Sequence, residues 1–296
     1  MPAASPIKRP RVGVVTVSYG SAEALEAFLA SLREHHGDSV AVVVADNKPE
    51  GKDGVSRIAA RHNALYVALP ANPGYGAGMN AGVQALSASL GSADPEFDAY
   101  FFCNPDVLFT APSIAELADS LFEDRAAGSI GPRTLNEDGS VYPSARNIPS
   151  IGTGVGHALF GRIWPSNPWS RAYKNASDYD ERRAAGWLSG AAVMVKRAVN
   201  DEIGGWDEGY FLHFEDIDLG YRIGLAGHTN VFEPAVTVVH SGGHSLKKHS
   251  AVAERAMTAS AIRFMKKRYS GVWLAPLRYA IIAGLRLRGA VKSRNA

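Results

Sequence analysis

Runs of consecutive apolar, often β-branched residues alternate with segments of helical periodicity over the first third of the chain. Unbroken apolar runs are typical of strands buried on both faces of a sheet, whereas apolar spacings of three and four residues are typical of helices. The pattern predicts strands at residues 12–19, 40–45, 65–69 and 98–103, and helices at residues 21–35 and 76–90. Repeated strand–helix–strand units predict an α/β fold with a parallel, doubly wound sheet, in which ligands bind at the carboxyl ends of the strands.

The pattern is less regular after about residue 125. Loops rich in Pro, Trp, Asn and Ser cover residues 142–170, and further strands are expected at residues 191–195 and 229–240, with a helix between them. We therefore expect a loose leader (residues 1–11), a main domain (residues 12–250) and a helical tail (residues 251–296).

The composition is that of an ordinary soluble globular protein, with 46% hydrophobic and 20% charged residues. The single cysteine, Cys103, excludes an internal disulfide and a cysteine-built metal site, and its apolar surroundings predict a packed thiol. We expect no secretory signal peptide, because the first residues do not form a basic segment followed by an apolar one. We expect no membrane-spanning segment, because no apolar stretch of the required length is free of charge.

The net charge of +2 is unevenly distributed. Residues 255–296 carry ten Lys and Arg but no Asp or Glu, so the preceding residues carry a net charge of −8. Basic positions mixed with aromatic and aliphatic ones predict a helix that lies on an anionic membrane surface, where each nearby cation contributes roughly 1 kcal/mol. The alternatives are a packing helix or a dimer contact. Nucleic acid is not an expected partner, because no recognised nucleic-acid-binding fold accompanies the basic run.

Three carboxylates, Glu215, Asp216 and Asp218, follow a run of large apolar side chains. Carboxylates this close repel one another, so they require a cation, an arginine or a catalytic role. Asp218 is spaced to pair with Arg222 one helical turn later. The alternative is an ordinary first turn of a helix, where acidic residues complement the helix dipole.

Polar residues also follow the predicted strands: Asp46 ends the second, and Asn104 and Asp106 follow the fourth. Asp46 can bond the base or ribose of a nucleotide, and Asp106 can hold a cation against a diphosphate. Each signal is weak alone, since turns often use these residue types.

A glycine-rich loop at residues 72–80 lies between these strand ends. Its glycines permit close backbone approach, and the following helix offers free N–H groups to a ligand. The loop follows the third strand rather than the first, so it is not a dinucleotide fingerprint, which disfavours a nicotinamide-dependent oxidoreductase.

In combination these elements resemble the family 2 inverting glycosyltransferases, which have a GT-A fold with a Rossmann-like, mostly parallel sheet flanked by helices. The matching segments are residues 12–19, 45–47, 72–80, 104–106, 186–190 and 214–218. Within the family, the chain is most similar to actinobacterial rhamnosyltransferases that act on decaprenyl-diphosphate-linked N-acetylglucosamine. Residues 138–146, 168–169 and 204–222 carry that closer resemblance.

The resemblance implies transfer of L-rhamnose from dTDP-L-rhamnose to a polyprenyl-diphosphate-linked N-acetylglucosamine in cell-wall linker synthesis. It implies a nucleotide-sugar half at residues 12–110, an acceptor half at residues 111–250 and an amphipathic helical extension at the C-terminus. The enzyme is expected to be cytoplasmic and peripheral on the inner face of the plasma membrane. Its oligomeric state stays open.

The resemblance also assigns roles to individual residues. Asp216 matches the catalytic base, which accepts the proton of a sugar hydroxyl. Asp106 and His240 match ligands of Mg²⁺ or Mn²⁺, although Asn104 replaces the first carboxylate of the Asp-x-Asp metal motif. The residues expected to bind the nucleotide sugar are Asp46, Asn72, Gly74, Asn80 and Asn104. The residues expected to bind the acceptor are Trp187, Ser189, Gly190, Glu215 and Arg146.

Other interpretations remain at this point. His240 is alternatively a hydrogen-bonded histidine at a strand end, and Trp187 a core residue beside a tight turn. The same fold and mechanism accommodate UDP-galactofuranose or GDP-mannose as donor. A non-catalytic module that binds nucleotide sugars or membranes is the alternative from another class.

Overall fold

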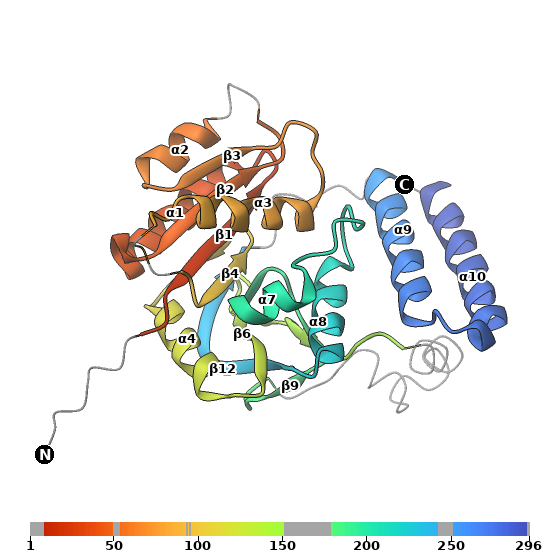
Figure 1. Cartoon of the computed structure of the whole chain (residues 1–296). Coiled ribbons are helices and arrows are strands. Elements are labelled where there is room, and N and C mark those ends of the chain that lie inside the picture. The colour runs from red at the N-terminus through yellow and green to blue at the C-terminus, as the bar shows by residue number, and fades with distance from the viewer. Residues whose placement is uncertain are drawn as a thin grey trace, which may run out of the picture.

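A ten-stranded mixed sheet forms the centre of the computed structural model, which describes residues 9–49, 54–92, 94, 96–150, 179–241 and 251–294 (Figure 1). The strands are β1 (Val12–Ser18), β2 (Ala41–Asp46), β3 (Leu65–Ala68), β4 (Ala99–Cys103), β5 (Val107–Leu108), β6 (Ala127–Leu135), β7 (Val141–Tyr142), β8 (Ala145–Arg146), β9 (Arg183–Ala185), β10 (Trp187–Leu188), β11 (Ala192–Lys196) and β12 (Thr229–His240). The helices are α1 (Ala22–His36), α2 (Val55–Arg61), α3 (Tyr75–Ala88), α4 (Ser113–Glu123), α7 (Arg197–Ile203), α8 (Glu215–Leu225), α9 (Ala251–Arg268) and α10 (Ala275–Arg294), with short 3-10 turns η1 (Gly37–Ser39) and η2 (Val272–Leu274).

The main path of the sheet has the strand order β3-β2-β1-β4-β11-β6-β12-β5. The first four strands are parallel, as the alternating strand and helix patterns predict. The sheet becomes mixed at β11, which runs antiparallel to both β4 and β6 because the chain returns to β4 from the opposite direction. Strands β8 and β10 form a separate antiparallel pair.

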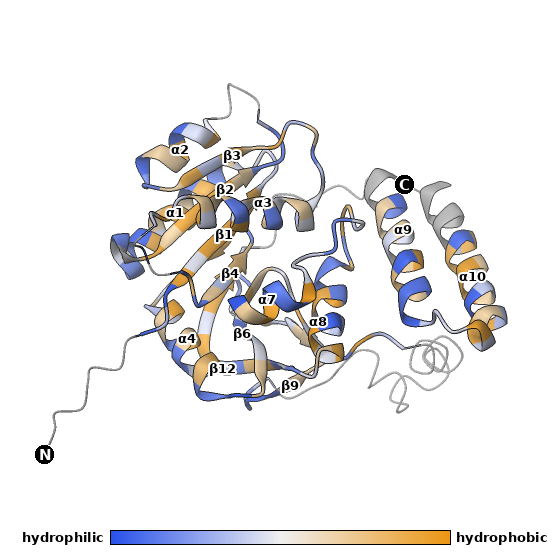
Figure 2. Ribbon diagram, in the orientation of Figure 1, coloured by the Kyte–Doolittle hydropathy of each residue, from blue (hydrophilic) through white to orange (hydrophobic). Residues whose placement is uncertain are grey.

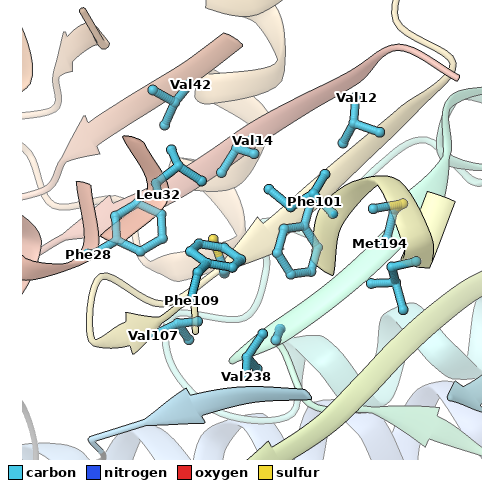
Figure 3. Close-up of a cluster of buried hydrophobic side chains, with 14 of the residues drawn as sticks. Val12, Val14, Phe28, Leu32, Val42, Phe101, Val107, Phe109, Met194 and Val238 are labelled. Atoms are coloured by element: carbon cyan, nitrogen blue, oxygen red, sulfur yellow. The ribbon is translucent and has the colours of Figure 1, made fainter. Parts of the chain in front are cut away.

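Helices cover both faces of the sheet, which explains the unbroken apolar runs. Val14 of β1 packs in a cluster with α1, α2 and α4, whereas Val15 and Val17 pack in a second cluster with α3, α7 and α8. Figure 3 shows the first cluster, in which Phe28 of α1 lies close to Phe109. Cys103 is fully buried in that cluster, so the predicted packed thiol is confirmed.

The sequence pattern did not predict α4 and β6. Helix α4 is short, with Ile114, Leu117 and Leu121 on its buried side. Strand β6 contains Gly128, Gly131 and Pro132, which lower its intrinsic strand propensity. It forms because β11 and β12 supply hydrogen-bonding partners on both sides. The loops expected at residues 142–170 lie mostly outside the described residues.

The predicted C-terminal extension consists of α9 and α10, which lie side by side as an antiparallel pair next to α8 (Figure 1). Phe264 of α9 is fully buried against Trp187, Tyr210 and Ile217 of the main domain. Hydrophobic and hydrophilic residues alternate along both helices (Figure 2). Among the described residues, no helix combines the length and apolar character needed to cross a bilayer.

Candidate active site

Asp46 lies at the carboxyl end of β2 and is almost fully buried. The backbone N–H of Lys48 and the hydroxyl of Tyr66 donate to its two oxygens, each at 3.0 Å. Burial and this hydrogen bond raise the pKa of Tyr66 to about 12, so the tyrosine remains a neutral donor. The two bonds fix the carboxylate at the strand end, where the sequence predicts nucleotide binding.

Gly74 connects the glycine-rich loop to the segment that leads into α8. A Cβ atom at Gly74 would lie only 2.6 Å from the carbonyl oxygen of Phe211, and its φ of +102° also favours glycine. The N–H of Tyr75 donates to that same carbonyl at 3.2 Å, and the Asn47 side chain donates to the carbonyl of Gly74 at 3.0 Å. Gly74 therefore joins the end of β2 to the residues before α8.

Asn72 and Asn80 lie at the two ends of the same loop. Asn72 has a positive φ of 44°, which asparagine tolerates in turns. The Asn80 side chain accepts from the N–H of Trp206 and donates to the Trp206 carbonyl and to Glu208, at 2.9–3.0 Å. Its amide thus helps to hold the turn at residues 205–208, and contact of Asn80 with a nucleotide stays a prediction.

Asn104, Asp106 and His240 come together where β5 pairs with the end of β12. Nε2 of His240 lies 3.1 Å from Oδ1 of Asp106 and 3.2 Å from Nδ2 of Asn104. His240 and Asp106 are both buried, and within the described part of the chain Asp106 Oδ1 and His240 Nδ1 have no hydrogen-bond partner. The short His240–Asp106 contact therefore lacks the geometry of a hydrogen bond.

These buried donors fit a divalent cation. A carboxylate oxygen suits Mg²⁺ or Mn²⁺, and an imidazole nitrogen suits Mn²⁺ in particular. The described residues contain no cluster of three or more His, Cys, Asp or Glu side chains placed for a metal. Asp106 and His240 would therefore need further oxygen ligands from outside this pair, such as a diphosphate.

The acidic cluster forms the first turn of α8, the placement that the sequence analysis gave as its alternative. His213 and Phe214 before it both have positive φ values, of 65° and 69°. Oδ1 of Asp216 accepts from the N–H of Ile217 at 2.9 Å, and Oδ2 accepts from the N–H of Gly190 at 3.2 Å. Free N–H groups at a helix start favour acidic residues, so the local sequence explains this placement.

Burial changes the acidity of both leading carboxyl groups. It raises the pKa of Glu215 to about 8, with a further contribution from Asp216, and among the described residues Oε2 of Glu215 has no partner. Burial also raises the pKa of Asp216, against the opposing effects of the Gly190 and Ile217 N–H groups and the Arg146 charge. A carboxylate with raised proton affinity is a stronger general base once ionised.

Tyr75 contacts Gly190 and Trp206, and the sequence patterns did not single it out. Its hydroxyl donates to the carbonyl of Gly190 at 2.8 Å. Burial raises its pKa well above the ordinary value, and the charges of Glu215, Asp216 and Asp106 add to the shift. The Tyr75 hydroxyl is therefore a neutral donor that holds the Gly190 carbonyl, while the N–H of Gly190 binds Asp216. Its position directly after Gly74 was the available sequence signal.

Trp187 is a core residue, which is the alternative interpretation of the sequence. It is 8% exposed, and its indole N–H donates to the Asn147 carbonyl at 3.1 Å. The guanidinium of Arg146 lies over its ring, 5.7 Å from the centroid. Little of Trp187 is therefore open to a sugar, and Arg146 is held over its ring by a hydrogen bond from its Nε to the Pro143 carbonyl.

Ser189 and Gly190 also serve the local structure. Ser189 is buried, its N–H donates to the Ser144 carbonyl, and its hydroxyl accepts from the N–H of Ala191. Gly190 binds Asp216 through its N–H and Tyr75 through its carbonyl. Direct contact of these residues with an acceptor stays a prediction.

Asp218 is fully buried and pairs with Arg222, as the spacing of the two residues predicts. The Arg222 Nε lies 2.6 Å from Oδ2, and the Tyr210 hydroxyl donates to Oδ1 at 3.2 Å. Lys267 of α9 also donates to Oδ1 at 2.6 Å, and it donates to Asp207 at 2.8 Å. Local spacing did not predict this second cation, because it lies 49 residues away along the chain.

Comparisons with known proteins support the resemblance. A family model described as glycosyl transferase family 2 matches residues 13–204. The chain is 39% identical over 287 residues, 96% of its length and 93% of the relative's, to N-acetylglucosaminyl-diphospho-decaprenol L-rhamnosyltransferase of Mycobacterium tuberculosis. It is 23% identical to rhamnosyltransferase WbbL of Escherichia coli K12, over 87% of this chain and 93% of that relative.

The fold is similar to that of a solved structure, mannosyltransferase PcManGT from Pyrobaculum calidifontis in complex with GDP-Man and Mn²⁺. The TM-score is 0.58 and the identity 17%, with 97% of this chain and 73% of that chain covered. The predicted α/β fold of the GT-A type is thereby confirmed.

Proposed function

The chain belongs to glycosyl transferase family 2, and from this premise we propose that it moves L-rhamnose from dTDP-L-rhamnose to polyprenyl-diphosphate-linked N-acetylglucosamine in cell-wall linker synthesis. The observation that carries the proposal is the 39% identity over nearly the whole chain to a relative whose name states that activity. The buried Asp106–His240 pair, together with the raised proton affinity of Glu215 and Asp216 at the start of α8, favours a catalytic protein over a binding module.

Asp216 is the proposed general base. Its carboxylate accepts the proton of the acceptor hydroxyl while that oxygen forms a bond to the anomeric carbon. The leaving nucleotide diphosphate departs from the opposite face, so the configuration inverts without a covalent intermediate. Glu215 keeps its proton at neutral pH because burial raises its pKa to about 8, so no second negative charge forms beside the base.

Asp106, His240 and Asn104 are the residues proposed to hold Mg²⁺ or Mn²⁺. The bound ion would offset the negative charge that develops on the departing diphosphate. Asp46, Asn72 and Gly74 would bind the nucleotide within the half at residues 12–110. Arg146 would face the acceptor diphosphate within the half at residues 111–250, since its charge already acts on Asp216.

The tail at residues 255–296 is proposed to hold the enzyme on the cytoplasmic face of the plasma membrane. Its ten basic residues without any acidic one support attraction to anionic lipid. A lipid-linked acceptor would be presented at the same surface.

The test is calorimetric titration of dTDP-L-rhamnose, UDP-galactofuranose and GDP-mannose, each with and without Mn²⁺. Metal-dependent preference for dTDP-L-rhamnose is the expected result. Preference for another donor would retain the fold and mechanism but refute the rhamnosyl assignment, and failure of all three to bind would favour the non-catalytic module.

The metal site has its own test in the same titrations. We expect Asp106→Ala and His240→Ala each to weaken the Mn²⁺-dependent part of donor binding by about tenfold or more, the scale seen when a metal site loses a supporting group. Asp138→Asn, an exposed carboxylate outside the site, is the matched control. Unchanged metal dependence in Asp106→Ala would exclude that residue as a ligand.

A further inference from the structure

The turn between α9 and α10 exposes a concentration of large apolar side chains. Trp273 is 96% exposed and Val272 is 82% exposed, and both belong to η2. Leu274, Leu277 and Tyr279 are also exposed, whereas the other exposed large apolar residues of the described chain are scattered over several elements. Single exposed apolar residues are common, but a contiguous group marks an interaction surface.

This turn, residues 269–279 (the tip), has a defined structure. The guanidinium of Arg278 donates to the Tyr269 carbonyl at 2.6 Å, and the N–H of Leu274 donates to the Gly271 carbonyl at 3.1 Å. Hydrogen bonds therefore close the turn while Val272 and Trp273 point away from the protein. The exposure of these side chains results from a built turn rather than from a frayed helix end.

Positive charge surrounds the tip. Lys266 and Arg268 lie in the last turn of α9 beside Lys267, which is paired with Asp207 and Asp218, and Arg278 lies in the tip. No acidic residue occurs from residue 255 onward. A second copy of this chain would bring the same positive charge, so repulsion opposes pairing of two tips. An anionic lipid bilayer matches both properties, because its headgroups attract Lys and Arg while tryptophan and tyrosine favour the interface.

The tip is connected through α9 to the start of α8. Lys267 donates to Asp218 at 2.6 Å and Ser260 donates to the Leu212 carbonyl at 2.9 Å, so α9 is bound both to α8 and to the segment before it. Val272 follows Lys267 by five residues, a chain length of at most about 17 Å. The tip therefore lies within a short distance of the helix that begins with Glu215 and Asp216.

We propose that Val272 and Trp273, with the apolar residues of the tip that follow, insert into the interface of an anionic bilayer and hold the start of α8 next to the lipid. Insertion of the tip is argued independently of the proposed function. Only the idea that this position brings the enzyme to a lipid-linked acceptor rests on that function. It differs from a tail lying flat on the membrane, because the turn rather than the face of a helix enters the lipid.

The experiment measures sedimentation of the full-length protein with phosphatidylcholine vesicles that contain or lack phosphatidylglycerol. The double variant Val272→Ser/Trp273→Ser should bind the anionic vesicles about tenfold or more weakly than the wild type, a difference of about 1.4 kcal/mol. The matched control is Leu225→Ser, which removes a 68% exposed leucine at the end of α8 and should bind like the wild type.

Quenching by brominated lipids tests insertion directly. Lipids brominated on the acyl chain should quench the wild-type tryptophan fluorescence, and Trp273→Phe should lose that quenching while still binding the vesicles. Equal vesicle binding by the double variant, or equal quenching in Trp273→Phe, would overturn the proposal. A dimer in the absence of lipid that depends on Trp273 would also overturn it.

These measurements need neither donor nor acceptor. The glycosyltransferase activity is assayed separately with a detergent-solubilised short-chain acceptor. Loss of the rhamnosyl assignment in that assay therefore leaves the lipid result standing, and failure of vesicle binding leaves the assignment standing.

Discussion

Most proteins bury apolar side chains and expose charged ones. The first turn of α8 buries charged side chains, whereas the tip between α9 and α10 exposes apolar ones. In α8, Asp218 is fully buried and Glu215 is 6% exposed, although both are acidic. In the tip, Trp273 is 96% exposed although it is the largest apolar residue type. Buried charge and exposed apolar surface each raise the free energy of the folded protein unless a partner compensates.

The difference lies in where the compensating partner comes from. Asp218 finds Arg222, Tyr210 and Lys267 within the chain, so its charge serves the fold. Among the described residues, Oε2 of Glu215 finds no partner, and Trp273 remains almost fully exposed. We propose that both residues face molecules from outside the chain, which are the substrate at the start of α8 and lipid at the tip.

The largest effect is expected from Asp216→Asn. Removing the proposed general base should lower turnover by about 10³-fold, since such catalysis contributes about 10²–10⁴-fold. The thermal midpoint should change little, because the substitution removes a desolvated carboxylate but leaves one of the two backbone N–H groups without an acceptor. Steady-state kinetics and calorimetry measure the two effects, with exposed Asp201→Asn as control. A folded Asp216→Asn protein with near-normal turnover would disprove the assignment.

Lys267→Met tests the compensated side of the comparison. It removes one cation from the buried Asp218, which keeps Arg222 and Tyr210, so we expect a loss of about 2 kcal/mol in the free energy of unfolding. Lys266→Met is the control, because Lys266 is an exposed neighbour with no ion pair among the described residues, and it should cost less than about 0.5 kcal/mol. Equal losses in urea unfolding would contradict the inference.

Glu215→Gln tests the uncompensated carboxyl group. The native protein holds the Glu215 proton up to about pH 8, whereas an unfolded glutamate loses it near 4.5. The native state then binds more protons, so stability falls as the pH rises between these values, by at most about 1.4 kcal/mol per pH unit for one group. The variant should show a shallower fall in a series of unfolding curves. An unchanged slope would mean that Glu215 ionises normally in the folded protein.

The smallest effect is expected from Trp273→Ala measured without lipid. An exposed side chain makes few contacts, so the free energy of unfolding should change by less than about 0.5 kcal/mol. Anionic vesicles should raise the thermal midpoint of the wild type more than that of the variant, because only the former gains full lipid contact. A large loss of stability in the absence of lipid would show that Trp273 packs against the protein.

The parallel half of the sheet could be predicted because its signals are local. Residues 12–18 contribute alternate side chains to two buried clusters, and an unbroken apolar run records that arrangement in the sequence. Strand β6 was not predicted, because its glycines and proline lower the local strand propensity. Pairing with β11 and β12 compensates for that low propensity in the folded protein. Such pairing is a property of the assembled sheet.

In the candidate site, too, features with local sequence signals could be predicted and features that depend on distant contacts could not. The acidic turn at residues 215–218 is visible in the sequence, as is the spacing of Asp218 and Arg222. The burial of Trp187 is not, because it depends on Gly220, where a Cβ atom would lie 2.6 Å from the Cβ of Trp187. The meeting of Asp106 with His240 came from the family resemblance, since no local rule relates residues so far apart.

Gly74 has a consequence for how this chain tolerates change. Its missing side chain lets the strand-end loop touch the backbone of Phe211, so one position constrains both halves of the site at once. A substitution at Asp46 changes only the end of β2, whereas any side chain at Gly74 displaces the segment that leads to Asp216. Relatives of this chain can therefore vary at neighbouring positions while keeping the same backbone, but we expect each of them to retain glycine at the position of Gly74.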